Sequence, residues 1–375
     1  MWQSIRIRRF RGFEEFELAG LGRVNLIGGR NNVGKTNLLE ALFLHSGGGN
    51  PELALRLNAF RGLVMAGGFI QMQAGRVSLA QDLFGSLFYR GEADKPFEIV
   101  TTDLQGTRIT TRFSIISQPL VSVPVPASGT AGPVPQPAPQ FRLVELGTIE
   151  HVTEPPGQEA EAQTFKLVGL IDFQTGQLVL QTDRPVPLSP FLAVFLPMHV
   201  RVPVEDASRL ANLIREGREQ PLTEALRVIE PRLRGLLPLP VLGVPIIHVR
   251  LEEGPLLPLA VAGEGMERLA RILLAVFTAR DGVVLVDEVE AGFHHSVLKD
   301  LWKVLAGATA QYQVQLFATT HDWETVVAAH EAFSELEAYE SFRYIRLDRE
   351  DGRVRAAVYE REDLQVAIER GLEVR

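Results

Sequence analysis

The sequence predicts an α/β fold, in which a mixed sheet with flanking helices is interrupted by an inserted mixed β/α lobe. A short apolar run, a glycine-rich turn and a helical segment follow one another near the N-terminus. From residue 246 onward the order strand, turn, helix, strand, helix, strand implies parallel strands joined by crossover helices. We therefore expect residues 1–48 and 246–375 to form the two parts of one core, with residues 49–245 as the inserted lobe.

The N-terminal elements are predicted from hydrophobic periodicity. Residues 2–9 alternate in polarity, and the chain continues through Phe10 and Phe13 to Phe16 and Leu18, which indicates a hairpin at a sheet edge. Residues 24–27 form a short buried strand. Residues 36–45 then have the apolar spacing of a helix.

The inserted lobe is predicted to be rich in β-structure up to about residue 200. Short β-like runs occupy residues 97–101, 107–116, 165–173 and 177–182. Residues 114–140 contain seven prolines and no charged residue, which predicts an extended loop. Residues 206–229 return to helical spacing before Pro231.

The C-terminal part is predicted to alternate strands and helices. Helices are expected at residues 264–280 and 296–308, and buried strands at 283–286 and 316–319. A hairpin with an Asp351-Gly352 turn and a short helix ending near Gly371 complete the chain.

Composition excludes several classes of protein. A hydrophobic fraction of 46% and a charged fraction of 22% are typical of a folded globular chain. No apolar run is long enough to span a membrane, and the N-terminus lacks the features of an export signal, so we expect a cytoplasmic protein. Cysteine is absent, which excludes disulfides and thiolate metal sites. The net charge of -8 argues against nucleic-acid binding by bulk electrostatics alone.

Residues 29–36 have the spacing of a phosphate-binding loop. Such a loop directs backbone N–H groups and a helix N-terminus at a nucleotide's phosphates, and glycine is needed where side chains would block the approach. Lys35 would supply a charge between the β- and γ-phosphates, and the Thr36 hydroxyl would be a ligand of Mg²⁺. The expected ATP-binding residues are Gly29, Asn31, Asn32, Val33, Gly34, Lys35, Thr36 and Asn37.

Two further strands end in polar residues that fit nucleotide hydrolysis. The strand at 283–286 runs into Asp287, which can hold Mg²⁺, and Glu288, which can accept a proton from the attacking water. The strand at 316–319 leads to His321, which we expect to meet the γ-phosphate and the water. Glu288 and His321 are therefore the candidate catalytic residues.

Three phrases of the sequence resemble ATP-binding-cassette (ABC) ATPases of the AAA superfamily, in the RecF, SMC and OLD grouping. They are residues 31–43, 287–298 and 318–321, and they occur in the order seen in that family. The resemblance is strongest to small stand-alone prokaryotic ATP-binding proteins that lack a Toprim domain. It implies a P-loop fold with an ABC-like mixed sheet, ATP and Mg²⁺ as cofactors, and a head-to-tail homodimer with ATP between the subunits.

The resemblance also implies residues that act across such a dimer. The signature segment, which caps the γ-phosphate of the opposite subunit, falls at Gly263, Glu264 and Gly265, although the usual signature serine has no counterpart. A plain turn at the start of a helix is the alternative. His294 and His295 fall in the dimer-contacting loop, and could equally begin the next helix. The glutamine that senses the nucleotide could be Gln71, Gln73 or Gln81.

The expected output of ATP turnover is a conformational switch in genome maintenance or anti-phage defence. A separately encoded effector is the expected partner, for example a Toprim-type nuclease, because this chain has no Asp-x-Asp pair of its own. The alternative is a RecF-like, ATP-dependent DNA-binding repair protein, which makes DNA a candidate partner. Its basic cluster would be Arg6, Arg8, Arg9 and Arg11. A transporter motor and a GTPase are disfavoured, since a Ser-Gly-Gly-Gln-like signature and an Asn-Lys-x-Asp motif are both missing.

Overall fold

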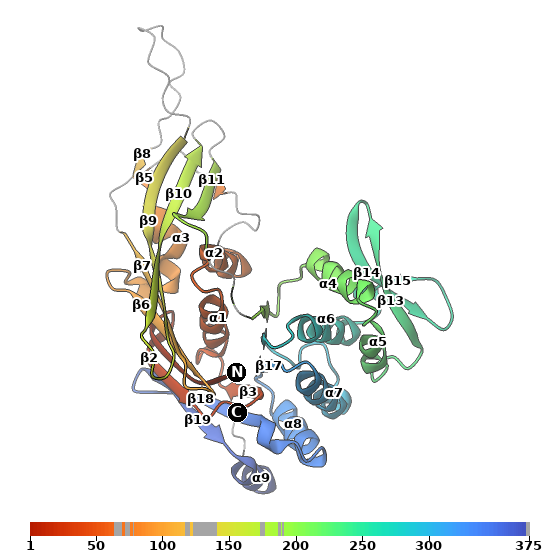
Figure 1. Ribbon diagram of the computed structural model, residues 1–375. Coiled ribbons are helices and arrows are strands. Elements are labelled where there is room, and N and C mark those ends of the chain that lie inside the picture. Colours follow the sequence, from red (N-terminus) through yellow and green to blue (C-terminus); the bar gives the residue numbers. More distant parts are fainter. Residues whose placement is uncertain are drawn as a thin grey trace.

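The computed structural model describes residues 1–63, 70–71, 76–77, 79–116, 121–122, 141–172, 177–186, 189 and 191–372. In this part of the chain the strands form sheets of eight, six, three and two strands (Figure 1). The predicted proline-rich loop at 114–140 lies mostly outside the described residues.

The six-stranded sheet is the core of the fold. Five of its strands are parallel and only the last is antiparallel to its neighbour, which confirms the predicted α/β class with a mixed sheet. In spatial order the strands are β12 (Ala193–Leu196), β16 (Val283–Val286), β17 (Gln315–Thr319), β3 (Val24–Gly29), β18 (Phe342–Glu350) and β19 (Arg353–Tyr359).

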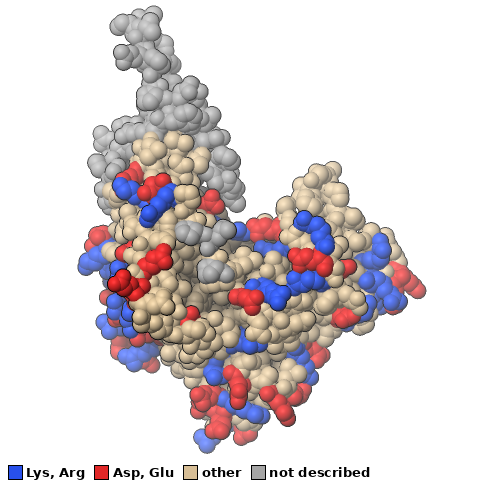
Figure 2. Space-filling model, viewed as in Figure 1, with Lys and Arg blue, Asp and Glu red and all other residues tan. Residues whose placement is uncertain are grey.

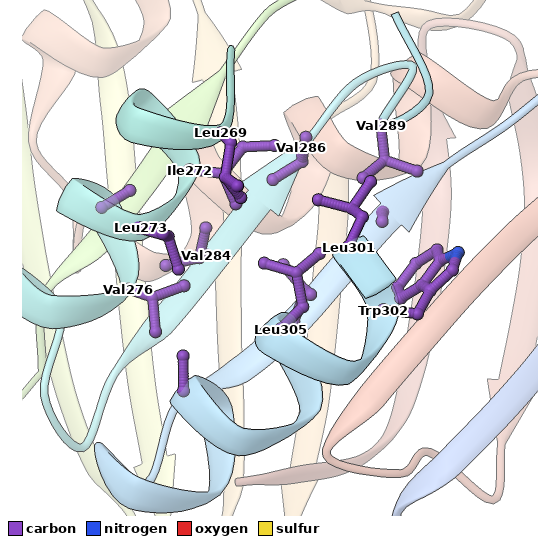
Figure 3. Packing of buried hydrophobic residues seen from close by; sticks show 14 of the residues in the cluster. Leu269, Ile272, Leu273, Val276, Val284, Val286, Val289, Leu301, Trp302 and Leu305 are labelled. Atoms are coloured by element: carbon purple, nitrogen blue, oxygen red, sulfur yellow. The ribbon is translucent and has the colours of Figure 1, made fainter. Parts of the chain in front are cut away.

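Both faces of the core sheet are buried, as expected for parallel strands with helices on their faces. In β16, Val284 and Val286 face one hydrophobic cluster, whereas Val283 and Leu285 face another. The first cluster includes α6 (Glu264–Thr278), α7 (Leu298–Gln311) and α8 (Trp323–Glu335); Figure 3 shows the apolar side chains of α6 and α7 packed around β16. The second includes α1 (Lys35–Ser46) and the eight-stranded sheet.

The eight-stranded sheet joins the N-terminal hairpin to strands of the predicted lobe. Its described order is β2 (Phe13–Ala19), β1 (Trp2–Phe10), β6 (Phe97–Asp103), β7 (Arg108–Ile115), β9 (Phe141–Glu154), β10 (Glu161–Asp172), β11 (Gln177–Thr182) and β4 (Ile70–Gln71). The sheets therefore cross the predicted boundaries at residues 48 and 245: β1 pairs with β6, and β12 pairs with β16. Strands that neighbour each other in a sheet need not be neighbours in the chain.

The remaining elements are helices and two small sheets. The predicted helical region 206–229 is two helices, α4 (Pro203–Arg215) and α5 (Gln220–Leu226), since Gly217 between them has a left-handed φ of 67°. The others are α2 (Pro51–Phe60), α3 (Leu79–Phe84), α9 (Arg361–Glu369), the three-stranded sheet of β13 (Leu233–Val241), β14 (Val244–Leu251) and β15 (Leu257–Pro258), and the pair β5 (Arg76–Val77) and β8 (Val121–Ser122). None of the helices described is long and apolar enough to cross a membrane.

His45 ties the end of α1 to the eight-stranded sheet. Its Nε2 lies 2.8 Å from the hydroxyl of Thr101 and its Nδ1 3.0 Å from the hydroxyl of Thr111, and the side chain is fully buried. Burial, reinforced by nearby His151, lowers the pKa of His45 to about 3. The imidazole is therefore neutral in the folded protein at neutral pH.

This histidine predicts an acid-sensitive fold. Between the folded pKa of about 3 and the unfolded value of about 6.5, the unfolded chain binds the extra proton, so the free energy of unfolding falls as pH falls, by up to about 1.4 kcal/mol per pH unit. Denaturant titrations at pH 7 and pH 5 should show that the free energy of unfolding falls more for the wild type than for His45→Gln, whose side chain cannot titrate. If the free energy of unfolding falls equally for both proteins, His45 does not contribute to the acid sensitivity of the fold.

Candidate active site

The predicted site residues lie at the carboxyl ends of β3, β16 and β17. Because β17 pairs with both β3 and β16, the residues after Thr319 lie between the phosphate loop and the acidic turn. Parallel strands bring these three chain segments to one edge of the sheet, although they are far apart in sequence. Open α/β sheets bind ligands at this edge.

The phosphate loop has the backbone conformation for which glycine is required. Gly29 has a φ of 130°, and a Cβ there would lie 2.3 Å from the carbonyl oxygen of Leu347. Gly34, with a φ of 119°, directly precedes α1. Lys35 Nζ donates to the carbonyl oxygens of Gly29 at 2.6 Å and Arg30 at 3.2 Å. Burial lowers the pKa of Lys35, and the acids at residues 287, 288 and 290 act in the opposite direction.

Some of the other loop residues are exposed, and others are buried or hydrogen-bonded. Asn31 and Asn32 are exposed, whereas Val33 is buried. The side chain of Asn37 accepts a hydrogen bond from Arg61 at 2.8 Å. Arg61 also pairs with the buried carboxylate of Glu40, which fixes the first turn of α1 against the residues after α2.

Thr36 and Asp287 converge on one point. The Thr36 hydroxyl lies 3.0 Å and 3.2 Å from the two carboxylate oxygens of Asp287. Hydroxyl and carboxylate oxygens are the ligands that Mg²⁺ prefers, so Thr36 and Asp287 fit the predicted metal position. Thr319 holds this arrangement, because its hydroxyl donates to Asp287 at 2.7 Å and accepts from the backbone N–H of Glu288 at 2.8 Å.

The turn that carries Glu288 is strained and clamped. Glu288 has a left-handed φ of 49°, which is uncommon for a residue other than glycine and occurs most often where neighbouring structure enforces it. Arg268 of α6 donates to the backbone carbonyl oxygens of Asp287 and Glu288. Burial lowers the pKa of Arg268 to about 10, with a contribution from Arg271, so the guanidinium remains charged at neutral pH. The helix that begins at the predicted signature is thus attached to the acidic turn.

His321 faces two acidic side chains. Its Nδ1 lies 3.0 Å from Glu290 Oε1 and 3.9 Å from Glu288 Oε2, and half of its side chain is exposed. Its backbone N–H donates to the same Glu290 oxygen at 3.0 Å. His321 and Glu288, the two candidate catalytic residues, therefore lie side by side.

The predicted signature segment lies at the start of α6, on the surface. Gly263 is the residue before the helix, with a φ of 120°, and the side chain of Glu264 is 70% exposed. A Cβ on Gly265 would lie 2.8 Å from the carbonyl oxygen of Gly292, so this glycine permits close contact with the loop after β16. Within the described part of the chain, this segment contacts that loop and Arg201.

The predicted dimer-contacting residues are exposed beside the signature. The rings of His294 and His295 are 4.0 Å apart between centroids. His294 also accepts a hydrogen bond from the backbone N–H of Ser296 at the start of a short 3₁₀ helix, His295–Val297. The two histidines therefore lie at the start of the next helix, which was the alternative left open by the sequence. Both rings remain exposed.

The basic cluster proposed for DNA binding is neutralised by acids. Each of its four arginines has an acidic partner: Glu17 for Arg6, Glu15 for Arg8, Glu92 for Arg9 and Glu40 for Arg11. Figure 2 shows acidic and basic side chains interspersed over the face in view. Of the candidate sensing glutamines, Gln81 donates to the carbonyl oxygen of Gly91, and the side chains of Gln71 and Gln73 lie outside the described residues.

Sequence patterns missed three residues that the structure brings to the site. Thr319 and Glu290 lie within the phrases at 318–321 and 287–298, but the sequence patterns indicated functional roles only for their neighbours. Arg268 looked like one polar position of an amphipathic helix. Only the fold shows that these side chains contact Asp287, Glu288 and His321.

Several known proteins are similar to this chain. Residues 186–328 match a family described as "AAA domain, putative AbiEii toxin, Type IV TA system". A Helicobacter pylori protein named ATP/GTP phosphatase is 21% identical over 387 residues, covering 98% of each chain. Among solved structures, an SMC head bound to the C-winged helix domain of ScpA is 12% identical with a TM-score of 0.47, covering 98% of this chain and 99% of that one. The SMC head domain of Thermotoga maritima is 12% identical with a TM-score of 0.41, covering 96% and 99%.

The matched AAA domain contains the acidic turn and His321, and the strand before α1 supplies the phosphate loop at the same sheet edge. The relative from Helicobacter pylori aligns over nearly the whole length of both chains, so the likeness is not confined to the motifs. The chain therefore contains a segment that matches the AAA domain family, and it is similar over nearly its whole length to a protein named ATP/GTP phosphatase.

Proposed function

We propose that the protein binds ATP with Mg²⁺ at residues 29–37 and hydrolyses it with Glu288 as the general base. The observation that carries this proposal is the convergence of Thr36 on Asp287 at 3.0 Å, with Glu288 and His321 beside them. Thr36 and Asp287 would hold Mg²⁺, which neutralises phosphate charge when bound. Lys35 would contact the β- and γ-phosphates. Glu288 would take the proton of the attacking water while His321 orients the γ-phosphate. The relative named ATP/GTP phosphatase supports nucleotide hydrolysis.

We further propose that the complete site forms between two head-to-tail copies. Gly263, Glu264, His294 and His295 are exposed and lie around the start of α6 and the loop after β16. The N-terminus of α6 offers unpaired backbone N–H groups, which favour an anion such as the γ-phosphate of the other copy. Hydrolysis would remove this anion and release the dimer, so that ATP acts as a switch.

The switch would act on a separate effector in genome maintenance or anti-phage defence. The arginines that could have favoured direct DNA binding are paired with acids, so the structure lends no specific support to the RecF-like alternative. A partner protein, such as a Toprim-type nuclease, remains our proposal for the output.

Mixing two inactive variants tests the shared site. Lys35→Ala removes the phosphate contact of one copy, and Glu264→Trp blocks the exposed signature without disturbing buried contacts. Each variant alone should hydrolyse almost no ATP. In a mixture, half of the dimers contain one intact site out of two, so about a quarter of wild-type turnover should return.

The mixture separates a shared site from a self-contained one. If Glu264→Trp alone keeps full activity, or if mixing restores nothing although both variants remain folded, the head-to-tail site is wrong. Circular dichroism and thermal unfolding of each variant provide the folding control.

A further inference from the structure

Glu290 is the acidic residue at the site to which neither the motifs nor the proposed chemistry gives a role. It follows the acidic turn, and only 10% of its side chain is exposed. Burial raises the pKa of Glu290. A carboxylate is costly to bury, so one retained beside a reactive centre calls for an explanation from its partners.

The partners of the Glu290 carboxylate are His321 and the side chain of Thr320. One oxygen, Oε1, accepts the backbone N–H of His321 at 3.0 Å and lies 3.0 Å from its Nδ1. The same carboxylate oxygen therefore accepts a hydrogen bond from the main chain of His321 and lies beside its ring. Lys35 and Arg268 are the basic groups whose charges reach Glu290, and Glu288 is the other acid that faces the ring.

This contact selects one form of the imidazole. A carboxylate oxygen next to Nδ1 favours the tautomer with its proton on Nδ1, which leaves Nε2 as the free nitrogen. Nε2 can then accept a hydrogen bond when neutral or donate one to a phosphate oxygen when protonated. Without the carboxylate, the ring is free to rotate and to place its proton on either nitrogen.

We propose that Glu290 is a positioning residue that fixes the orientation and tautomer of His321 for ATP hydrolysis. This inference rests on the proposed function, because it assumes that His321 acts in the reaction. Glu290 acts through His321 and does not itself contact the nucleotide. Its loss should therefore lower kcat while leaving the KM for ATP nearly unchanged.

A double-mutant cycle tests the proposal on the full-length protein with ATP and Mg²⁺. Glu290→Ala, His321→Ala and the double variant are compared with the wild type for kcat and KM. We expect Glu290→Ala to lower kcat about 10- to 100-fold, by analogy with the loss seen when a group that orients a metal-binding histidine is removed. In the His321→Ala background, Glu290→Ala should have almost no further effect, because the residue on which it acts is gone.

Two additional variants keep this result interpretable. Glu290→Gln keeps a side-chain oxygen that can accept from the backbone N–H and from the ring Nδ1 of His321. The kcat of Glu290→Gln should therefore be closer to the wild type than that of Glu290→Ala. Glu324→Ala removes an exposed acid from the first turn of α8, near His321, and should be unchanged. Thermal unfolding shows whether each variant is folded.

The outcomes distinguish failure of this inference from failure of the proposed function. If wild type and His321→Ala hydrolyse ATP equally, the proposed role of His321 is wrong. If His321→Ala is impaired but Glu290→Ala is not, or if the two losses multiply in the double variant, Glu290 does not act through His321.

Discussion

Glu288→Gln should abolish ATP turnover while leaving ATP binding intact. The amide has the shape of the carboxylate but cannot accept the proton of the attacking water, and removal of a general base lowers kcat by about 100- to 10,000-fold. The backbone conformation of Glu288 is enforced by Thr319 and Arg268, and the substitution alters neither contact because both are to main-chain atoms. Phosphate release and fluorescent ATP binding measure the two properties separately.

The same variant should accumulate as an ATP-bound dimer. If hydrolysis releases the two copies, blocking it traps them, and light scattering with ATP and Mg²⁺ should report twice the monomer mass. Glu324→Gln, an exposed acid on α8, serves as the matched control and should behave as wild type. Normal hydrolysis by Glu288→Gln would show that another group activates the water.

Lys35→Ala should prevent tight ATP binding. A hydrogen bond to a charged group contributes about 1.5–3 kcal/mol, which corresponds to a loss of affinity of about 10- to 150-fold. Lys35 Nζ is directed into the phosphate loop, where it donates to the carbonyl oxygens of Gly29 and Arg30, so the substitution removes this positive charge from the loop. Isothermal titration with ATP and Mg²⁺ measures the change.

The control for this variant is Lys95→Ala, since Lys95 is exposed and far from the loop in sequence. Its ATP affinity should match the wild type. Unfolding midpoints should be similar for both variants, because Lys35 is only partly buried and its partners are loop carbonyls that water can reach. Tight binding by a folded Lys35→Ala would place the phosphates elsewhere.

The local elements of this fold were predictable because their periodicity is strong. The strand at 283–286 is wholly apolar and is buried on both faces, and the helix at 264–280 has one apolar stripe. The prediction of a single helical region at 206–229 was too coarse, since Gly217 adopts a left-handed conformation that ends the first helix. Glycine permits such a conformation but does not require it, so composition could not decide this point.

The partition of the chain into sheets was beyond sequence patterns. The hairpin at residues 2–19 looked like part of the core, and residues 193–196 looked like part of the lobe, but each pairs with strands of the other region. Strand pairing depends on contacts between residues far apart in the chain. No local pattern specifies which distant edge a strand will join.

For the site, the sequence by itself determined which groups we propose for the chemistry: the glycines of the phosphate loop, Lys35, Thr36, Asp287, Glu288 and His321 all follow from residue type and position after a strand. Only the tertiary structure decided what holds them. Thr319, Arg268 and Glu290 reach the site because parallel strands end at one edge and α6 packs beneath it. The reactivity of a side chain depends on its type, which a sequence shows directly. The contacts that hold a side chain in place depend on proximity, which arises only when distant segments fold together.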